Sequence, residues 1–300
     1  MTVRHLSVDY NKVNERGVFS PGDTLSGRVT VVTSGETKVQ CFLVKAKGKA
    51  KVKWHEQDGR AEGMHVDRRK YFYFEHIIIQ DKNKGDGSEV IRSGRHAYPF
   101  TFVIPNTDMP SSYEGKWGKI TYSLKAQLTQ SIWLVHKTKT RFPFLTKSEF
   151  PFASKSEMII IGLKVWNRLA SVCECVFFFS RVCLNRSPNG EAMGVSVQVL
   201  NHSAHTVTPK FYLCEKQTFA ADSKRIVHTN ETLFGTGDPI AAQTCQTKTK
   251  VLSIPTQLHP TFFNCCMMKL EYRLKVFIHD SPQPHTQKPK RSIWFHNLPG

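Results

Sequence analysis

Short stretches of alternating hydrophobic and polar residues, separated by turn-forming residues, run through the first half of the chain. Residues 6–10 alternate, residues 21–23 read Pro-Gly-Asp, residues 26–32 are rich in β-branched side chains, and residues 98–104 place Phe100, Phe102 and Ile104 on one side. A period of two is that of a half-buried strand. Many such strands with regular turns predict an antiparallel β-sandwich. The first 150 residues show no helical periodicity of useful length, so the predicted class is all-β.

One stretch of the second half repeats a stretch of the first at a constant offset. Val195, Val197 and Val199 alternate, and residues 211–213, 251–254 and 270–278 are predicted strands. Residues 104–105, 110, 122, 124 and 125 (Ile-Pro, Pro, Tyr, Leu, Lys) recur 150 positions later. A fixed period of this kind indicates two copies of one structural module.

The length of 300 residues agrees with two domains at roughly 150 residues each. We predict two immunoglobulin-like β-sandwiches in tandem, at residues 1–155 and 156–285, followed by a basic tail at residues 286–300. Residues 172–184 alternate weakly, so the second sandwich is expected to begin with irregular or incomplete strands and an exposed edge. Residues 160–300 alone are then expected to aggregate, and residues 1–158 to stay soluble.

The charge balance is strongly basic, with 42 Lys and Arg against 24 Asp and Glu and a net charge of +18. Such a field attracts lipid headgroups, nucleic acid or phosphorylated peptides. The first residues lack a secretory pattern, and the apolar run at 169–184 contains Glu174 and Arg181 and is shorter than the roughly 20 residues of a spanning helix. We therefore expect a cytosolic protein with reduced cysteines, and the cysteine spacings do not predict a metal site.

Every second residue between positions 45 and 53 is a lysine. In a strand all of these ammonium groups would line one face, where they repel one another unless an acidic residue or an anionic ligand is near. The candidate site contains Lys45, Lys47, Lys49, Lys51, Lys53, Arg68, Arg69 and Lys70, with Trp54 as an apolar anchor and residues 136–141 (His-Lys-x-Lys-x-Arg) as an extension.

Two interpretations of the lysine strand remain open. It is either a solvated edge strand that lysines protect from aggregation, or a face that binds phosphate groups on a membrane or a phosphorylated tail. Nucleic-acid binding would need exposed aromatic residues for stacking, which only Trp54 offers, and the sequence has no recognised nucleic-acid motif. No catalytic, phosphate-loop or zinc-enzyme motif is present, so we expect neither an enzyme nor a cofactor.

Several motifs resemble those of a known family. Residues 19–27 (Phe-x-Pro-Gly-Asp-x-Leu-Ser-Gly), 93–105 (Ser-Gly-x-His-x-Tyr-Pro-Phe-x-Phe-x-Ile-Pro), 110–115 and 118–122 are similar to an arrestin N-terminal domain of the α-arrestin kind. Residues 201–203 (Asn-His-Ser), 209–210, 254–255 and 270–272 resemble an arrestin C-terminal domain.

The resemblance implies a non-catalytic adaptor in membrane-protein trafficking. Such an adaptor binds cytosolic segments of membrane receptors or transporters and promotes their endocytosis, endosomal sorting or ubiquitination. It is expected in the cytoplasm, peripheral to the plasma membrane and endosomes, and an anionic membrane surface is a further expected partner. α-Arrestins engage the WW domains of ubiquitin ligases through Pro-Pro-x-Tyr motifs, but these 300 residues contain no Pro-Pro dipeptide. Either the chain binds cargo without recruiting a ligase directly, or it is a truncated isoform.

Overall fold

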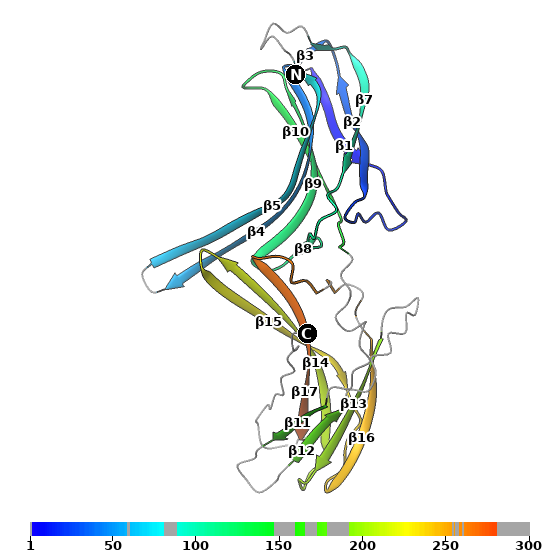
Figure 1. Cartoon of the computed structure of the whole chain (residues 1–300), viewed down its shortest axis with the longest axis vertical. Coiled ribbons are helices and arrows are strands. Elements are labelled where there is room, and N and C mark those ends of the chain that lie inside the picture. The colour runs from blue at the N-terminus through cyan, green and yellow to red at the C-terminus, as the bar shows by residue number, and fades with distance from the viewer. Residues whose placement is uncertain are drawn as a thin grey trace. The chain divides into compact units, whose positions relative to one another are not determined.

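The computed structural model describes residues 2–58, 61–80, 89–146, 160–165, 173–178, 192–253, 255, 258–259 and 261–280. Within these ranges the regular elements are strands β1 to β17, and none is a helix (Figure 1). The chain divides into two compact units. The first contains Met1–Lys147, Thr218–Ile226 and Phe262–Lys269, and the second contains Ser148–Gln217, Val227–Thr261 and Leu270–Gly300.

The first unit is built from two main sheets. One sheet has the order β1-β2-β7, with β1 at Val3–Tyr10, β2 at Thr24–Thr33 and β7 at Gly94–Val103. The other has the order β10-β9-β4-β5, with β10 at Val135–Phe142, β9 at Gly118–Thr129, β4 at Cys41–Asp58 and β5 at Ala61–Gln80; β8 (Tyr113–Glu114) also pairs with β9. The short strands β3 (Thr37–Lys38) and β6 (Val90–Ile91) pair with each other.

The core of the first unit lies between these sheets and is rich in aromatic rings. Phe42 of β4 contacts Tyr98 of β7 at 5.3 Å between ring centroids. The Tyr122 hydroxyl on β9 is buried and donates a hydrogen bond to the Pro110 carbonyl at 2.6 Å. Because successive strand residues point to opposite faces, burying one side of β4 in this core places the intervening residues on the outer face.

The second unit also contains two sheets. The first has the order β11-β12-β13-β16, with β11 at Ile160–Val165, β12 at Cys173–Phe178, β13 at Ala192–Asn201 and β16 at Thr244–Ser253. The other has the order β15-β14-β17, with β15 at Lys224–Thr236, β14 at Val207–Ala221 and β17 at Met268–Asp280. Most of this sheet belongs to the second unit, whereas its residues within Thr218–Ile226 and 268–269 belong to the first. The alternating valines of β13 are buried in a core with Phe211 and Ile240. The predicted tandem all-β sandwich is confirmed.

Two strands are described in the opening of the second sandwich, where irregular or incomplete strands were predicted. β11 pairs with β12 from Ile160↔Phe178 to Val165↔Cys173 without a register shift, and β12 pairs with β13. Among the strands that the structure describes, β11 is the last in its sheet. The predicted boundary at residues 155–156 and the basic tail at 286–300 lie outside the described residues.

Of the apolar run at residues 169–184, only the segment Cys173–Phe178 is described, and it forms strand β12. The described residues include no helix with the length and apolar character needed to cross a membrane.

Candidate functional site

The lysines of β4 lie on the outer face of a central strand. Lys45, Lys47, Lys49 and Lys51 are partly exposed, whereas Ala46, Ala50 and Val52, which lie between them, are buried. β9 and β5 flank β4 on its two sides, so the strand is not at an edge. The interpretation of a lysine-protected edge strand is therefore wrong.

The neighbouring strands add further basic side chains to the same face, because residues paired across an antiparallel ladder point to the same side. Lys45 pairs with Lys125 of β9, which pairs in turn with Lys139 of β10. On the other side, Lys51 pairs with Arg68 of β5. We call this surface the basic face; it comprises Lys45, Lys47, Lys49, Lys51, Lys53, Arg68, Lys70, Lys119, Lys125, Lys137, Lys139 and Arg141.

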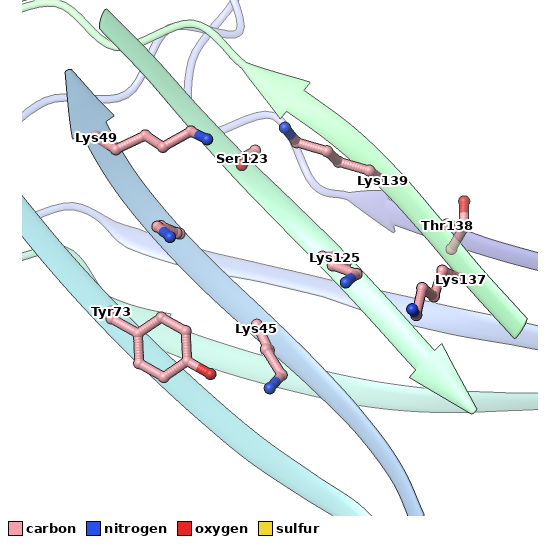
Figure 2. Close-up of a pocket in the computed structure, with 9 residues that line it drawn as sticks. Lys45, Lys49, Tyr73, Ser123, Lys125, Lys137, Thr138 and Lys139 are labelled. Carbon is pink, nitrogen blue, oxygen red and sulfur yellow. The ribbon is translucent and has the colours of Figure 1, made fainter. Parts of the chain in front are cut away.

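The middle of the basic face is hollowed. The hollow has a volume of about 480 Å³ and is lined by Lys45, Lys47, Lys49, Tyr73, Ser123, Lys125, Lys137, Thr138 and Lys139. Figure 2 shows the side chains of Lys49 and Lys139 reaching toward each other across Ser123. Ammonium groups from three strands thus surround one space, an arrangement that can donate several charge-assisted hydrogen bonds to a single anion.

The positive charge of the basic face is largely uncompensated in the part of the chain that the structure describes. Burial lowers the pKa of Lys49, and the nearby charges of Lys139 and Lys47 lower it further. The pKa values of Lys125 and Lys139 are lowered by the same causes, burial first and neighbouring cations second. An anion bound here would relieve this mutual repulsion.

Lys45 differs from its neighbours because it has an acidic partner. Its ammonium lies 3.0 Å from the Glu75 carboxylate, which also accepts a 2.6 Å hydrogen bond from the Tyr73 hydroxyl. The contact with Tyr73 and the pairing with Glu75 raise the pKa of Lys45. At the far side of the face, Arg141 lies 3.6 Å from Glu114, with both side chains more than half exposed. Such an exposed pair is weak.

Two residues predicted for the site lie elsewhere. Trp54 is only 4% exposed, faces the opposite side of β4, and stacks near His65 at 5.2 Å between ring centroids. Arg69 pairs with Ala50 and shares its face, and its guanidinium lies 5.9 Å from the Tyr71 ring centroid. Trp54 therefore cannot serve as an exposed anchor or stack on a nucleic-acid base.

Two contributors on β9, Lys119 and Lys125, were missed from the sequence. They are separated by the uncharged residues Ile120 to Leu124, so they do not form a lysine run. Lys119 and Lys125 are an even number of residues apart, so in a strand both side chains point to the same face. That observation indicates a shared site with the β4 lysines only when the partner strand and its register are known. Among the described residues, no group of three or more His, Cys, Asp or Glu side chains is arranged to hold a metal ion.

Comparison with known proteins identifies both halves of the chain. Residues 6–148 match the family profile described as arrestin (or S-antigen), N-terminal domain, and residues 188–293 match the corresponding C-terminal domain. Arrestin domain-containing protein 4 of Homo sapiens is 23% identical over 277 residues, which is 88% of this chain. The chain belongs to the α-arrestin family. Thioredoxin-interacting protein of Pongo abelii is 24% identical to this α-arrestin over 272 residues, or 87% of the chain.

This α-arrestin spans about two thirds of the length of those relatives, 65% of the first and 67% of the second. The resemblance read from the motifs is thereby confirmed for both domains.

Proposed function

We propose that this α-arrestin is an adaptor in membrane-protein trafficking that binds phosphorylated cytosolic segments of membrane receptors or transporters. In this proposal it acts in the cytoplasm, at the plasma membrane and endosomes, and promotes endocytosis, endosomal sorting or ubiquitination of its cargo. The observation that carries the proposal is the basic face, on which four strands of an arrestin N-terminal domain present lysines with few acidic partners.

The spacing of the basic face suits an extended phosphorylated peptide. Alternate residues of a strand lie roughly 6.6 Å apart, and neighbouring strands lie about 4.8 Å apart. An extended peptide with phosphates on every second residue would have the same repeat as Lys45, Lys47 and Lys49. Each phosphate could then accept hydrogen bonds from ammonium groups on more than one strand.

A binding measurement with a defined peptide tests this proposal. The probe is a synthetic peptide with phosphoserines at three alternate positions, compared at fixed ionic strength with its unphosphorylated form. We expect the full chain to prefer the phosphorylated peptide, and the triple variant Lys47→Gln, Lys49→Gln, Lys125→Gln to bind it at least tenfold more weakly.

The control variant removes the same number of charges away from the basic face. Lys38, Lys248 and Lys250 lie on β3 and β16, and changing all three to Gln should alter the affinity by less than twofold. Equal binding of the two peptides would overturn the proposal, as would an equal loss in the two variants, which would indicate only an effect of net charge.

A further inference from the structure

The turn between β9 and β10 exposes two large hydrophobic side chains. Ile132 is 80% exposed and Trp133 is 90% exposed. The core therefore does not explain their presence. Adjacent exposed apolar residues of this size at the end of a hairpin are a candidate contact site for a partner or a membrane.

The turn is held in a defined conformation. The Gln130 amide donates to the Leu134 carbonyl at 2.9 Å, and the Leu134 amide donates to the Ser131 carbonyl at 3.2 Å. The Gln130 side chain is fixed in turn, because its amide group donates to the Thr2 hydroxyl at 3.3 Å and its carbonyl oxygen lies 3.1 Å from His136 Nε2. The exposed pair is thus presented by an ordered turn, and little conformational entropy remains to be lost when it binds.

The exposed pair lies at the end of the strands that carry the basic face. Lys137 follows Trp133 by four residues on β10, a rise of roughly 13 Å along an extended chain. A side chain inserted roughly 5–10 Å into the headgroup boundary would leave Lys137 close enough to feel an anionic surface, whose potential decays over about 8–10 Å. Apolar insertion and electrostatic attraction can therefore act together at this end of the sheet.

We propose that the β9–β10 turn docks this α-arrestin on an anionic lipid bilayer, with Ile132 and Trp133 in the headgroup boundary and Lys137 at its surface. Tryptophan is enriched at such boundaries because its ring is apolar and its N–H is polar. A bilayer also needs no complementary pocket, whereas a stable protein interface buries roughly 800 Å² on each partner, far more than two side chains provide. Single-stranded nucleic acid would stack on Trp133, but it would gain little from the aliphatic Ile132.

This contact goes beyond the proposed adaptor function, because it concerns the membrane itself and does not require phosphorylated cargo. The test uses the full chain and sedimentation with vesicles of phosphatidylcholine, alone or mixed with phosphatidylserine. We expect binding to the mixed vesicles to be much stronger, and the double variant Ile132→Ser, Trp133→Ser to reduce it at least tenfold.

The control removes exposed apolar surface elsewhere in the same unit. Val103 of β7 is 62% exposed, and Val103→Ser should leave vesicle binding within twofold of the wild type. A conservative variant, Trp133→Phe, should retain most of the binding. Unfolding midpoints equal to that of the wild type would exclude misfolding as the cause of any loss.

A spectroscopic readout locates the inserted residue. Bromine-labelled lipids quench tryptophan emission only at short range, and the difference between wild type and Trp133→Phe isolates the emission of Trp133. Quenching of that emission supports insertion. Its absence, or unchanged vesicle binding by the double variant, would overturn the proposal.

Two further outcomes are informative. If Trp133→Ser abolishes binding of a single-stranded oligonucleotide and leaves vesicle binding intact, the turn contacts nucleic acid and the proposal is wrong. If the double variant loses vesicle binding but still distinguishes the phosphorylated peptide from its control, the membrane contact is supported separately from the cargo site. If the double variant keeps vesicle binding but no longer distinguishes the two peptides, the proposed membrane contact is wrong, and the proposed function is not overturned by that result.

Discussion

Gly48 allows β4 to carry the basic face on one side and a tightly packed aromatic cluster on the other. A Cβ atom at this position would lie 2.8 Å from the Phe72 ring and 2.8 Å from the Tyr122 ring. The register between β4 and β5 also shifts between Gly48 and Lys49, which marks a bulge beside the hollow. Glycine is suited to such close approach of neighbouring groups.

We predict that Gly48→Ala destabilises the first unit by about 1–3 kcal/mol, because the added methyl group overpacks two rigid rings. Gly63→Ala provides the control, since its nearest contact would be His65 Nε2 at an ordinary 3.5 Å. Urea unfolding of both variants measures the effect. A loss for Gly63→Ala as large as that for Gly48→Ala would show that the close ring contacts are not the cause.

Residue type alone did not identify the exposed tryptophan of this sheet. Trp54 follows the lysine run directly, yet its position in the alternation places it in the core. Trp133 is separated from that run by a long stretch of sequence, but it occupies a turn and is exposed. Trp54 directly follows Lys53, so alternation along the strand places its side chain on the face opposite the lysines. The burial of Trp54 could therefore have been predicted from the sequence. The exposure of Trp133 depends on where two strands end, which is the least certain feature of a strand pattern.

At the scale of the strand, β4 was predictable and its neighbours were not. The lysine alternation in residues 45–53 depends only on the period of two, and the structure has it. The contributions of β9 and β10 depend on which strands pair and in what register. Those are non-local properties, because Lys45 and Lys125 are far apart in sequence. Nor does the local sequence distinguish a central from an edge position, so only the sheet order could exclude the edge-strand interpretation.

The burial of three lysines on different strands, together with the cations around them, predicts a pH dependence of stability. Folding lowers the pKa of Lys49, Lys125 and Lys139 below the ordinary lysine value of 10.5. The folded state therefore binds fewer protons than the unfolded state as the pH approaches 10.5, so this contribution to stability increases with pH. A second triple variant, Lys49→Gln, Lys125→Gln, Lys139→Gln, should be more stable than the wild type near pH 7. The difference in the free energy of unfolding between the two proteins should shrink as the pH rises toward 10.

Urea unfolding of both proteins between pH 7 and pH 10 measures this difference. Burial raises the pKa of Cys41 and Cys214, which opposes the lysine effect above the ordinary cysteine value. That contribution occurs in both proteins and cancels in the comparison. A difference that stays constant with pH would contradict the prediction, because the pKa values of the lysines, lowered by burial and by neighbouring cations, would then not be the source of the added stability.

At the scale of the whole molecule, the two copies of the module differ in whether an equivalent lysine has an acidic partner. Lys125 and Lys275 are related by the offset of 150, and both lie on strands that carry a buried tyrosine, Tyr122 or Tyr272. Lys125 faces the hollow among other cations. Lys275 is buried, and its ammonium lies 2.7 Å from Glu231.

The sheet of β14, β15 and β17 contains further charge pairs of this kind. Glu271 contacts Lys216 at 2.7 Å and Arg273 at 3.2 Å. Lys125 of the first copy thus lies among cations, whereas Lys216, Arg273 and Lys275 of the second copy each contact a carboxylate. The repeat in the sequence predicted two similar folds, but it did not predict this difference in charge pairing, because Glu231 is far from Lys275 in sequence and Glu271 is far from Lys216.

The equivalent substitutions Lys125→Gln and Lys275→Gln should therefore have opposite effects. Lys125→Gln removes a repelled charge, so the free energy of unfolding should stay equal or rise, while affinity for the phosphorylated peptide falls several-fold. Lys275→Gln removes a hydrogen bond between charged groups and its 4.7 Å contact with the Phe277 ring. We expect it to cost about 1.5–3 kcal/mol and to leave peptide affinity unchanged. Urea unfolding and peptide titration of the two variants measure both quantities. Comparable stability losses in the two variants, or loss of peptide affinity in Lys275→Gln alone, would contradict the assignment of ligand binding to Lys125 and of stabilisation to Lys275.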